Sequence, residues 1–105
     1  MTLTAALFVM AAQATSLSGE ARHQWQQWER CIVAAATPQA DSRRPVERVI
    51  DEAMTRCDAD ERALGQLVVR DLGASRGTYY MRGFRNQTRL NMIRALAARR
   101  ARSVT

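Results

Sequence analysis

The first regular pattern of apolar positions lies between residues 18 and 36, where apolar residues recur at alternating steps of four and three. Such steps place residues on one face of a helix, so a helix that begins near Ser18 is predicted. The residues of this stripe are Ala21, Trp25, Trp28, Ile32 and Ala35. Cys31 lies beside the same face. We expect both tryptophans to pack in a core rather than to form a ligand platform.

A loop is predicted over residues 37–45, and a second helix over residues 45–72. Pro38 cannot continue the first helix without losing a backbone hydrogen bond, whereas Pro45 suits the first turn of the next helix. The positions expected to face inward are Val46, Ile50, Ala53, Cys57, Leu64, Leu67 and Val68. Either Asp60 or Glu61 interrupts this stripe. The two helices are therefore expected to form an antiparallel hairpin.

A third helix is predicted over residues 78–101, after the helix-breaking residues 73–77. In its first half, the aromatic residues and Met81 point one way and the arginines point the other way. Past Thr88 the apolar residues lie on roughly the side of the helix that carries the arginines in the first half. These apolar residues are Leu90, Met92, Ile93, Leu96 and Ala97. Either the helix kinks near residues 83–88 or its two halves pack against different neighbours. No segment alternates with the period of a strand, so the predicted fold class is all-α.

The chain opens with a segment typical of an export signal. Residues 3–12 carry no charge, and Ala12, Gln13 and Ala14 fit the small-x-small pattern that precedes a cleavage site. The segment lacks the basic residues that usually precede the apolar part of a signal peptide, because the first arginine is Arg22. The interpretation is a signal peptide over residues 1–14 and one small helical domain over residues 15–105 in the periplasm or outside the cell. The alternative is a buried first helix of a cytoplasmic protein, and an uncleaved segment would tether the domain to a membrane.

The two cysteines, Cys31 and Cys57, allow one intramolecular disulfide. In an exported chain an even number of cysteines indicates disulfides, whereas in the cytosol they are normally buried thiols. Their separation of 26 residues differs from the C-x-x-C spacing of redox catalysts and zinc ribbons. A structural disulfide that links the hairpin is therefore predicted, and in the chain-entropy model it contributes about 3 to 4 kcal/mol.

Charge is unevenly distributed along the chain. Up to Asp71 there are eight arginines and ten carboxylates, whereas from Leu72 onward there are eight arginines and no carboxylate. Such asymmetry indicates an anionic partner: a lipid surface, an acidic protein or nucleic acid. The candidate partner-binding residues are Arg82, Arg85, Arg89, Arg94, Arg99, Arg100 and Arg102. The alternative is that this helix folds back on the acidic residues 58–61 and uses some of these arginines internally.

No constellation of catalytic or metal-binding residues is apparent. The single histidine, His23, has no second ligand at metal-binding spacing, and residues 58–61 lack the turn glycine of a calcium loop. We therefore expect no enzyme activity, no metal and no cofactor. Asp58 and Arg62, and likewise Glu52 and Arg56, are spaced to form ion pairs along a helix.

Part of the chain resembles small exported two-cysteine helical proteins of proteobacteria. The resemblance covers residues 25–72 and rests on Trp28-x-x-Cys31, a short Pro-containing loop, Ala53-x-x-x-Cys57-x-x-x-Glu61-x-Ala63-Leu64 and a basic terminal helix. It implies a disulfide-linked hairpin in the periplasm and implies no activity.

Two functional hypotheses follow. The first is an exported, non-catalytic interaction or structural module whose basic C-terminal helix contacts an anionic membrane surface or an acidic protein. The second is a cytosolic nucleic-acid-binding protein whose arginines contact phosphates, with Tyr79, Tyr80 or Phe84 available to stack on bases.

Overall fold

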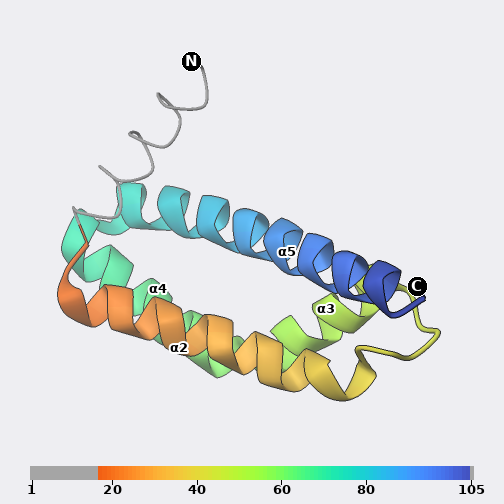
Figure 1. Ribbon diagram of the computed structural model, residues 1–105. Coiled ribbons are helices and arrows are strands. Elements are labelled where there is room, and N and C mark those ends of the chain that lie inside the picture. Colours follow the sequence, from red (N-terminus) through yellow and green to blue (C-terminus); the bar gives the residue numbers. More distant parts are fainter. Residues whose placement is uncertain (1–16, 105) are drawn as a thin grey trace.

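The computed structural model describes residues 17–104, and Figure 1 shows that they form two layers of helices. In chain order the elements are α2 (Gly19–Ala36), a short 3-10 helix η1 (Thr37–Gln39), α3 (Val46–Arg56), α4 (Asp58–Leu72) and α5 (Ala74–Val104). Helices α2 and α5 run side by side in one direction, and α3 and α4 run back behind them. The described residues contain no strand, which confirms the all-α prediction. The expected export segment, residues 1–14, lies outside the described residues.

Helix α2 begins where its sequence pattern predicts. The Oγ of Ser18 accepts a hydrogen bond from the backbone N–H of Ala21 at 3.1 Å and so caps the helix. Its buried residues are Ala21, Trp28, Ile32 and Ala36. Trp25 is partly buried, and its ring lies 4.5 Å from the ring of Phe84 in α5. Both tryptophans therefore pack in the core, as expected.

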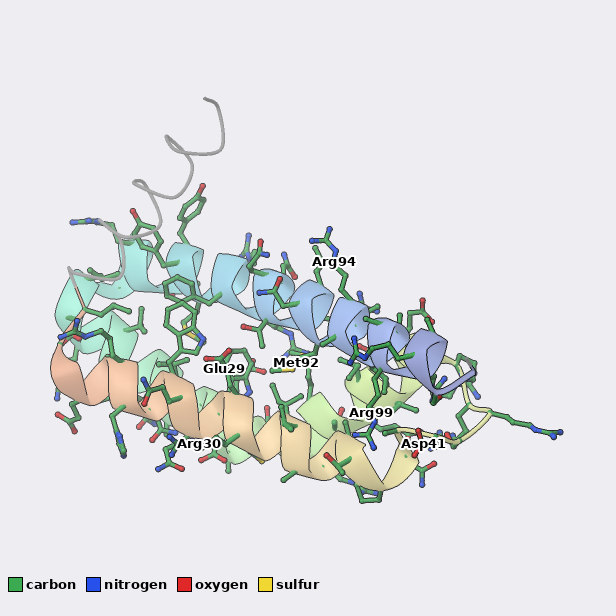
Figure 2. The ribbon with its side chains drawn as sticks, viewed as in Figure 1. Glu29, Arg30, Asp41, Met92, Arg94 and Arg99 are labelled. Atoms are coloured by element: carbon green, nitrogen blue, oxygen red, sulfur yellow. A yellow bond between two sulfur atoms is a disulfide. The ribbon has the colours of Figure 1, made fainter. Side chains whose placement is uncertain are left out.

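Helices α2 and α5 both pack on the layer formed by α3 and α4, and they contact each other less than they contact that layer. Figure 2 shows Glu29 of α2 and Met92 of α5 in the space between the two helices. Both residues line a surface hollow there. An open groove therefore separates α2 from α5 beyond the contact between Trp25 and Phe84.

The predicted single helix over residues 45–72 is wrong, because the chain forms two helices that meet at Cys57. The backbone N–H of Cys57 closes α3 by donating to Ala53 O at 3.1 Å and to Met54 O at 3.2 Å. Helix α4 then starts with three acids in its first turn, Asp58, Asp60 and Glu61. Negative charge at this end stabilises a helix through its dipole. The acids that interrupt the apolar stripe therefore mark the start of a new helix.

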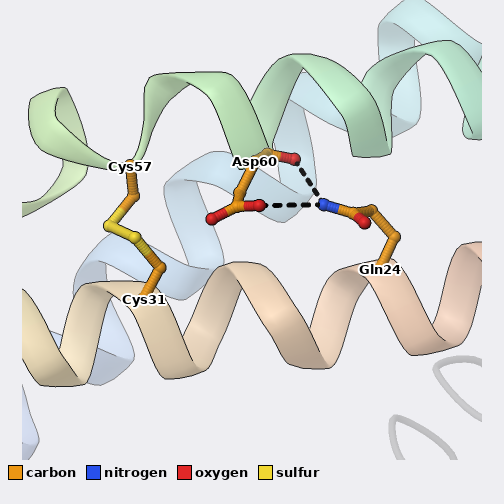
Figure 3. The surroundings of a disulfide bond; sticks show 4 residues. All are labelled: Gln24, Cys31, Cys57 and Asp60. Carbon is orange, nitrogen blue, oxygen red and sulfur yellow. Dashed lines mark hydrogen bonds between the residues drawn. A yellow bond between two sulfur atoms is a disulfide. The ribbon is translucent and has the colours of Figure 1, made fainter.

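The predicted disulfide is present, and it lies at the junction of α3 and α4. The Cα atoms of Cys31 and Cys57 are 5.9 Å apart, and Cys57 is 1% exposed. Close to the bond, Gln24 Nε2 of α2 donates to the backbone oxygen of Asp60 at 3.1 Å (Figure 3). The disulfide therefore holds α2 against the second layer at Cys57, where the helical structure is interrupted between α3 and α4.

The turn into α5 is shorter than predicted. Gly73 has a φ of 87°, a backbone conformation that favours glycine, and its N–H donates to Val69 O at 2.8 Å. Helix α5 then begins at Ala74 rather than at Thr78, so the expected breaker region 73–77 consists of one turn residue and the first helical turn. The consequence is that Arg76 lies on α5.

Helix α5 is one continuous helix, so the predicted kink near residues 83–88 is wrong. Its two ends instead contact different neighbours, α4 and α3, which confirms the other alternative. Three residues of the apolar side predicted past Thr88 face inward: Met92, Ile93 and Leu96. Tyr79 is 72% exposed and Leu90 is 43% exposed, in contrast to the expected apolar faces.

Gly77 allows α5 to approach the backbone of α4 closely. A Cβ atom at this position would lie 2.7 Å from Val69 Cα, which is backbone and cannot move aside cheaply. At Gly83, on the same helix, a Cβ atom would have no atom of residues 17–104 within 4 Å.

The two glycines therefore give a matched pair of variants. Gly77→Ala is expected to lower the free energy of unfolding by about 1 to 3 kcal/mol, because overpacking pushes α5 off α4. Gly83→Ala is expected to raise it by up to about 1 kcal/mol, because alanine favours a helix. Urea unfolding of both variants measures the difference. Equal shifts in the two variants would contradict the close contact.

Candidate anion-binding face

Helix α5 contains eight arginines and no acidic residue. Exposed positions recur along it at steps of three and four, which places them on one side of the helix. We call this side the outer face; its residues are Arg76, Tyr79, Arg82, Asn86, Leu90, Arg94, Ala97 and Ala101. The outer face is a basic stripe with exposed aromatic and aliphatic side chains between its charges.

Three arginines of the outer face have no partner among the described residues. Arg76, Arg82 and Arg94 are exposed and make no ion pair or side-chain hydrogen bond to residues 17–104. Figure 2 shows Arg94 pointing away from α2. Their guanidinium groups are therefore available to an external anion.

Arg85 and Arg89 face the second layer and are used inside the fold. Arg85 pairs with Glu61 at the start of α4. Arg89 binds both carboxylate oxygens of Asp51 in α3, with Nε–Oδ1 at 2.7 Å and Nη2–Oδ2 at 3.2 Å. The alternative in which α5 folds back on acidic residues is thus realised for these two arginines. Only Glu61 among the partners belongs to residues 58–61.

Arg100 ties the end of α5 to the loop that follows α2. Its guanidinium donates to three backbone oxygens of that loop: Ala40 at 2.9 Å, Arg44 at 2.5 Å and Gln39 at 3.1 Å. Arg99 pairs with Asp41 at 3.7 Å. Arg102 is exposed on the last turn of α5 and is not counted among the arginines without a partner. Of the seven arginines proposed from sequence, two thus remain on the outer face, and Arg76 joins them. Sequence reasoning missed Arg76 because it placed this residue in a loop.

The other residues considered from the sequence lie at the surface or in ion pairs. His23 is exposed, and its Nε2 lies 3.3 Å from Gln27 Nε2. Asp58 pairs with Arg62 as predicted, whereas Glu52 pairs with Arg44 instead of Arg56. The described part of the chain has no cluster of side chains able to hold a metal ion. A large surface hollow runs along α3, and its acids Asp51 and Glu52 are already engaged with arginines.

No protein-family model, curated protein or solved structure matches this chain. Among the helices of residues 17–104, none is long and apolar enough to cross a bilayer.

Ion pairs to arginine lower the pKa of several carboxyl groups. The side-chain hydrogen bond from Arg89 lowers the pKa of Asp51, and the bond from Arg44 lowers the pKa of Glu52. The pKa of Asp71 is lowered chiefly because its carboxylate accepts the backbone N–H of Ser18 at 2.9 Å. A carboxyl with a lowered pKa stabilises the fold above its unfolded pKa, and this contribution is lost as the pH falls through the folded pKa.

We predict that Arg89→Gln removes a pH-dependent part of the stability. Wild type should be more stable than the variant at pH 7. The difference should begin to shrink as the pH falls below the ordinary aspartate pKa of about 4, and it should vanish only below the lowered pKa of Asp51 in the folded state. Arg82→Gln, on the same helix but without an internal partner, serves as the control and should show no such pH dependence. Urea midpoints between pH 2 and pH 7 measure both differences. A difference for Arg89→Gln that persists at low pH would contradict the ion pair.

Proposed function

We propose that this protein is an exported, non-catalytic helical module that binds an anionic membrane surface through the outer face of α5. The observation that carries the proposal is the composition of that face. Three arginines without a partner among residues 17–104 alternate with exposed Tyr79 and Leu90 on a helix without acids. Basic residues interleaved with aromatic and aliphatic ones are typical of helices that lie at a lipid interface.

The disulfide supports the export part of the proposal. Disulfides persist in the periplasm and outside the cell, where thiols are not kept reduced. A link between Cys31 and Cys57 is consistent with such a compartment. The signal-like residues 1–14 would deliver the chain there.

The distribution of the arginines favours a lipid surface over nucleic acid. Nucleic-acid binders obtain most of their affinity from many phosphate contacts. Arg85, Arg89, Arg99 and Arg100 already bind groups of the fold, so the seven arginines needed by that hypothesis are not all available. A membrane interface requires fewer charges because exposed apolar side chains also contribute.

The expected affinity for membranes is modest. Each arginine near an anionic surface contributes about 1 kcal/mol, so three contribute about 3 kcal/mol. Tyr79 and Leu90 add apolar contacts at the interface. Binding is therefore weak and reversible, and it decreases with salt.

Co-sedimentation with vesicles tests the proposal. Wild type should bind vesicles of mixed phosphatidylglycerol and phosphatidylcholine, and should bind pure phosphatidylcholine vesicles much more weakly. The triple variant Arg76→Gln, Arg82→Gln, Arg94→Gln should bind the anionic vesicles roughly 100-fold more weakly, which corresponds to about 3 kcal/mol.

A second triple variant controls for net charge. Arg22→Gln, Arg43→Gln and Arg48→Gln remove the same charge from exposed positions outside α5 and should leave binding nearly unchanged. An equal loss in both variants would contradict the assignment to the outer face. Tighter binding to duplex DNA than to anionic vesicles at the same salt concentration would favour the nucleic-acid hypothesis instead.

A further inference from the structure

The groove between α2 and α5 forms a second exposed surface, on a different side of α5 from the outer face. Most of its lining residues are apolar, and they include Val33, Ala36, Ile50, Met92, Ala95 and Leu96. A cavity of about 120 Å³ opens into it. Val33, at its edge, is 53% exposed although it is a large aliphatic residue. Exposed apolar surface around a cavity is typical of a protein–protein contact.

Opposite charges lie on either side of the apolar centre. Figure 2 shows Glu29 in the groove to one side of Met92, with Arg30 on the same side at the edge of α2 away from α5, and shows Arg99 and Asp41 on the other side. Each side therefore carries one acid and one base. Among the described residues, Glu29 and Arg30 make no ion pair, whereas Arg99 and Asp41 are in contact at 3.7 Å.

Glu29 is unusual among the acids of this chain. Its carboxylate has no hydrogen-bond or ion-pair partner among residues 17–104, and partial burial raises its pKa. A partly buried carboxylate without a partner is costly, and a cation placed against it would remove the cost. Among residues 17–104, no cation is paired with Glu29, although Arg30 follows it in the chain.

A second copy of the chain, related to the first by a two-fold axis through the apolar centre, would supply a cation to Glu29. In a face-to-face dimer with the axis across the helices, each side of one groove meets the opposite side of the other groove. Glu29 precedes Val33 by four residues, which is about 6 Å along a helix. Arg99 follows Met92 by seven residues, or about 10 Å, and helical side chains lean back toward the N-terminus. Glu29 and the Arg99 guanidinium therefore lie at similar distances from the centre, on opposite sides.

We infer that the α2–α5 groove is the interface of a symmetric homodimer. In this dimer, Val33 and Met92 of the two copies meet at the centre. Glu29 of each copy binds Arg99 of its partner, and Arg30 binds Asp41 of its partner. The order of charges along the groove is self-complementary, because each acid of one copy meets a base of the other copy. This order favours a second copy of the chain over an unrelated partner.

The arrangement is compatible with the membrane-binding proposal but does not depend on it. When the two-fold axis is perpendicular to the helices and lies in the plane of the groove, the outer faces of the two copies point in the same direction. Two basic stripes would then face one membrane, which increases the apparent affinity without new contacts. The dimer itself is tested in solution without vesicles.

Sedimentation equilibrium of the oxidised protein tests the inference. Wild type is expected to reach twice the mass of the single chain as its concentration rises. Glu29→Arg should weaken dimerisation at least tenfold, because it places two cations together. The double variant Glu29→Arg, Arg99→Glu should restore most of the loss, because it exchanges the two charges.

Two further variants make the result specific. Glu47→Arg makes the same charge change on the exposed side of α3 and should leave the dimer intact. Val33→Asp should abolish the dimer while the fold, monitored by circular dichroism, stays unchanged, because Val33 is already half exposed. A wild-type monomer at concentrations up to about 1 mM would overturn the inference. A dimer that Glu29→Arg and Val33→Asp leave unaffected would overturn it as well.

Discussion

The structure depends on the disulfide between Cys31 and Cys57. It joins α2 to the residue at which α3 ends and α4 begins, so three helices meet at one covalent link. A small domain with a limited core gains most from such a link, because the link removes conformational freedom from the unfolded chain. Helices α3 and α4 form the layer on which α2 and α5 pack.

The arginines of α5 divide into two groups with different tasks. Arg85, Arg89 and Arg100 bind groups on α4, α3 and the loop after α2, and together they fix the rotation of the helix about its axis. This rotation directs Arg76, Arg82 and Arg94 away from the core. The internal ion pairs are thus the physical reason why one helix can pack on the domain and also present a basic face.

Much of the fold could be predicted from the sequence, because α2 has a regular apolar stripe and a serine cap, and because two cysteines allow one pairing. The break at Cys57 was missed because the acids after it were interpreted as an interruption, although acids in sequence suit a helix start. The start of α5 was missed because Gly73 and Gly77 were grouped as breakers, although Gly77 serves close packing on Val69. Partners of individual arginines, such as Asp51 for Arg89, depend on the tertiary fold and leave no local signal.

We propose that the chain functions outside the cytoplasm as a disulfide-linked module. The most direct measurement is the intact mass of the protein from its native host, treated with an alkylating reagent before and after reduction. We predict a chain that begins at Thr15 and is alkylated at both cysteines only after reduction. A chain that retains residues 1–14 and is alkylated at Cys31 and Cys57 without reduction would contradict the claim.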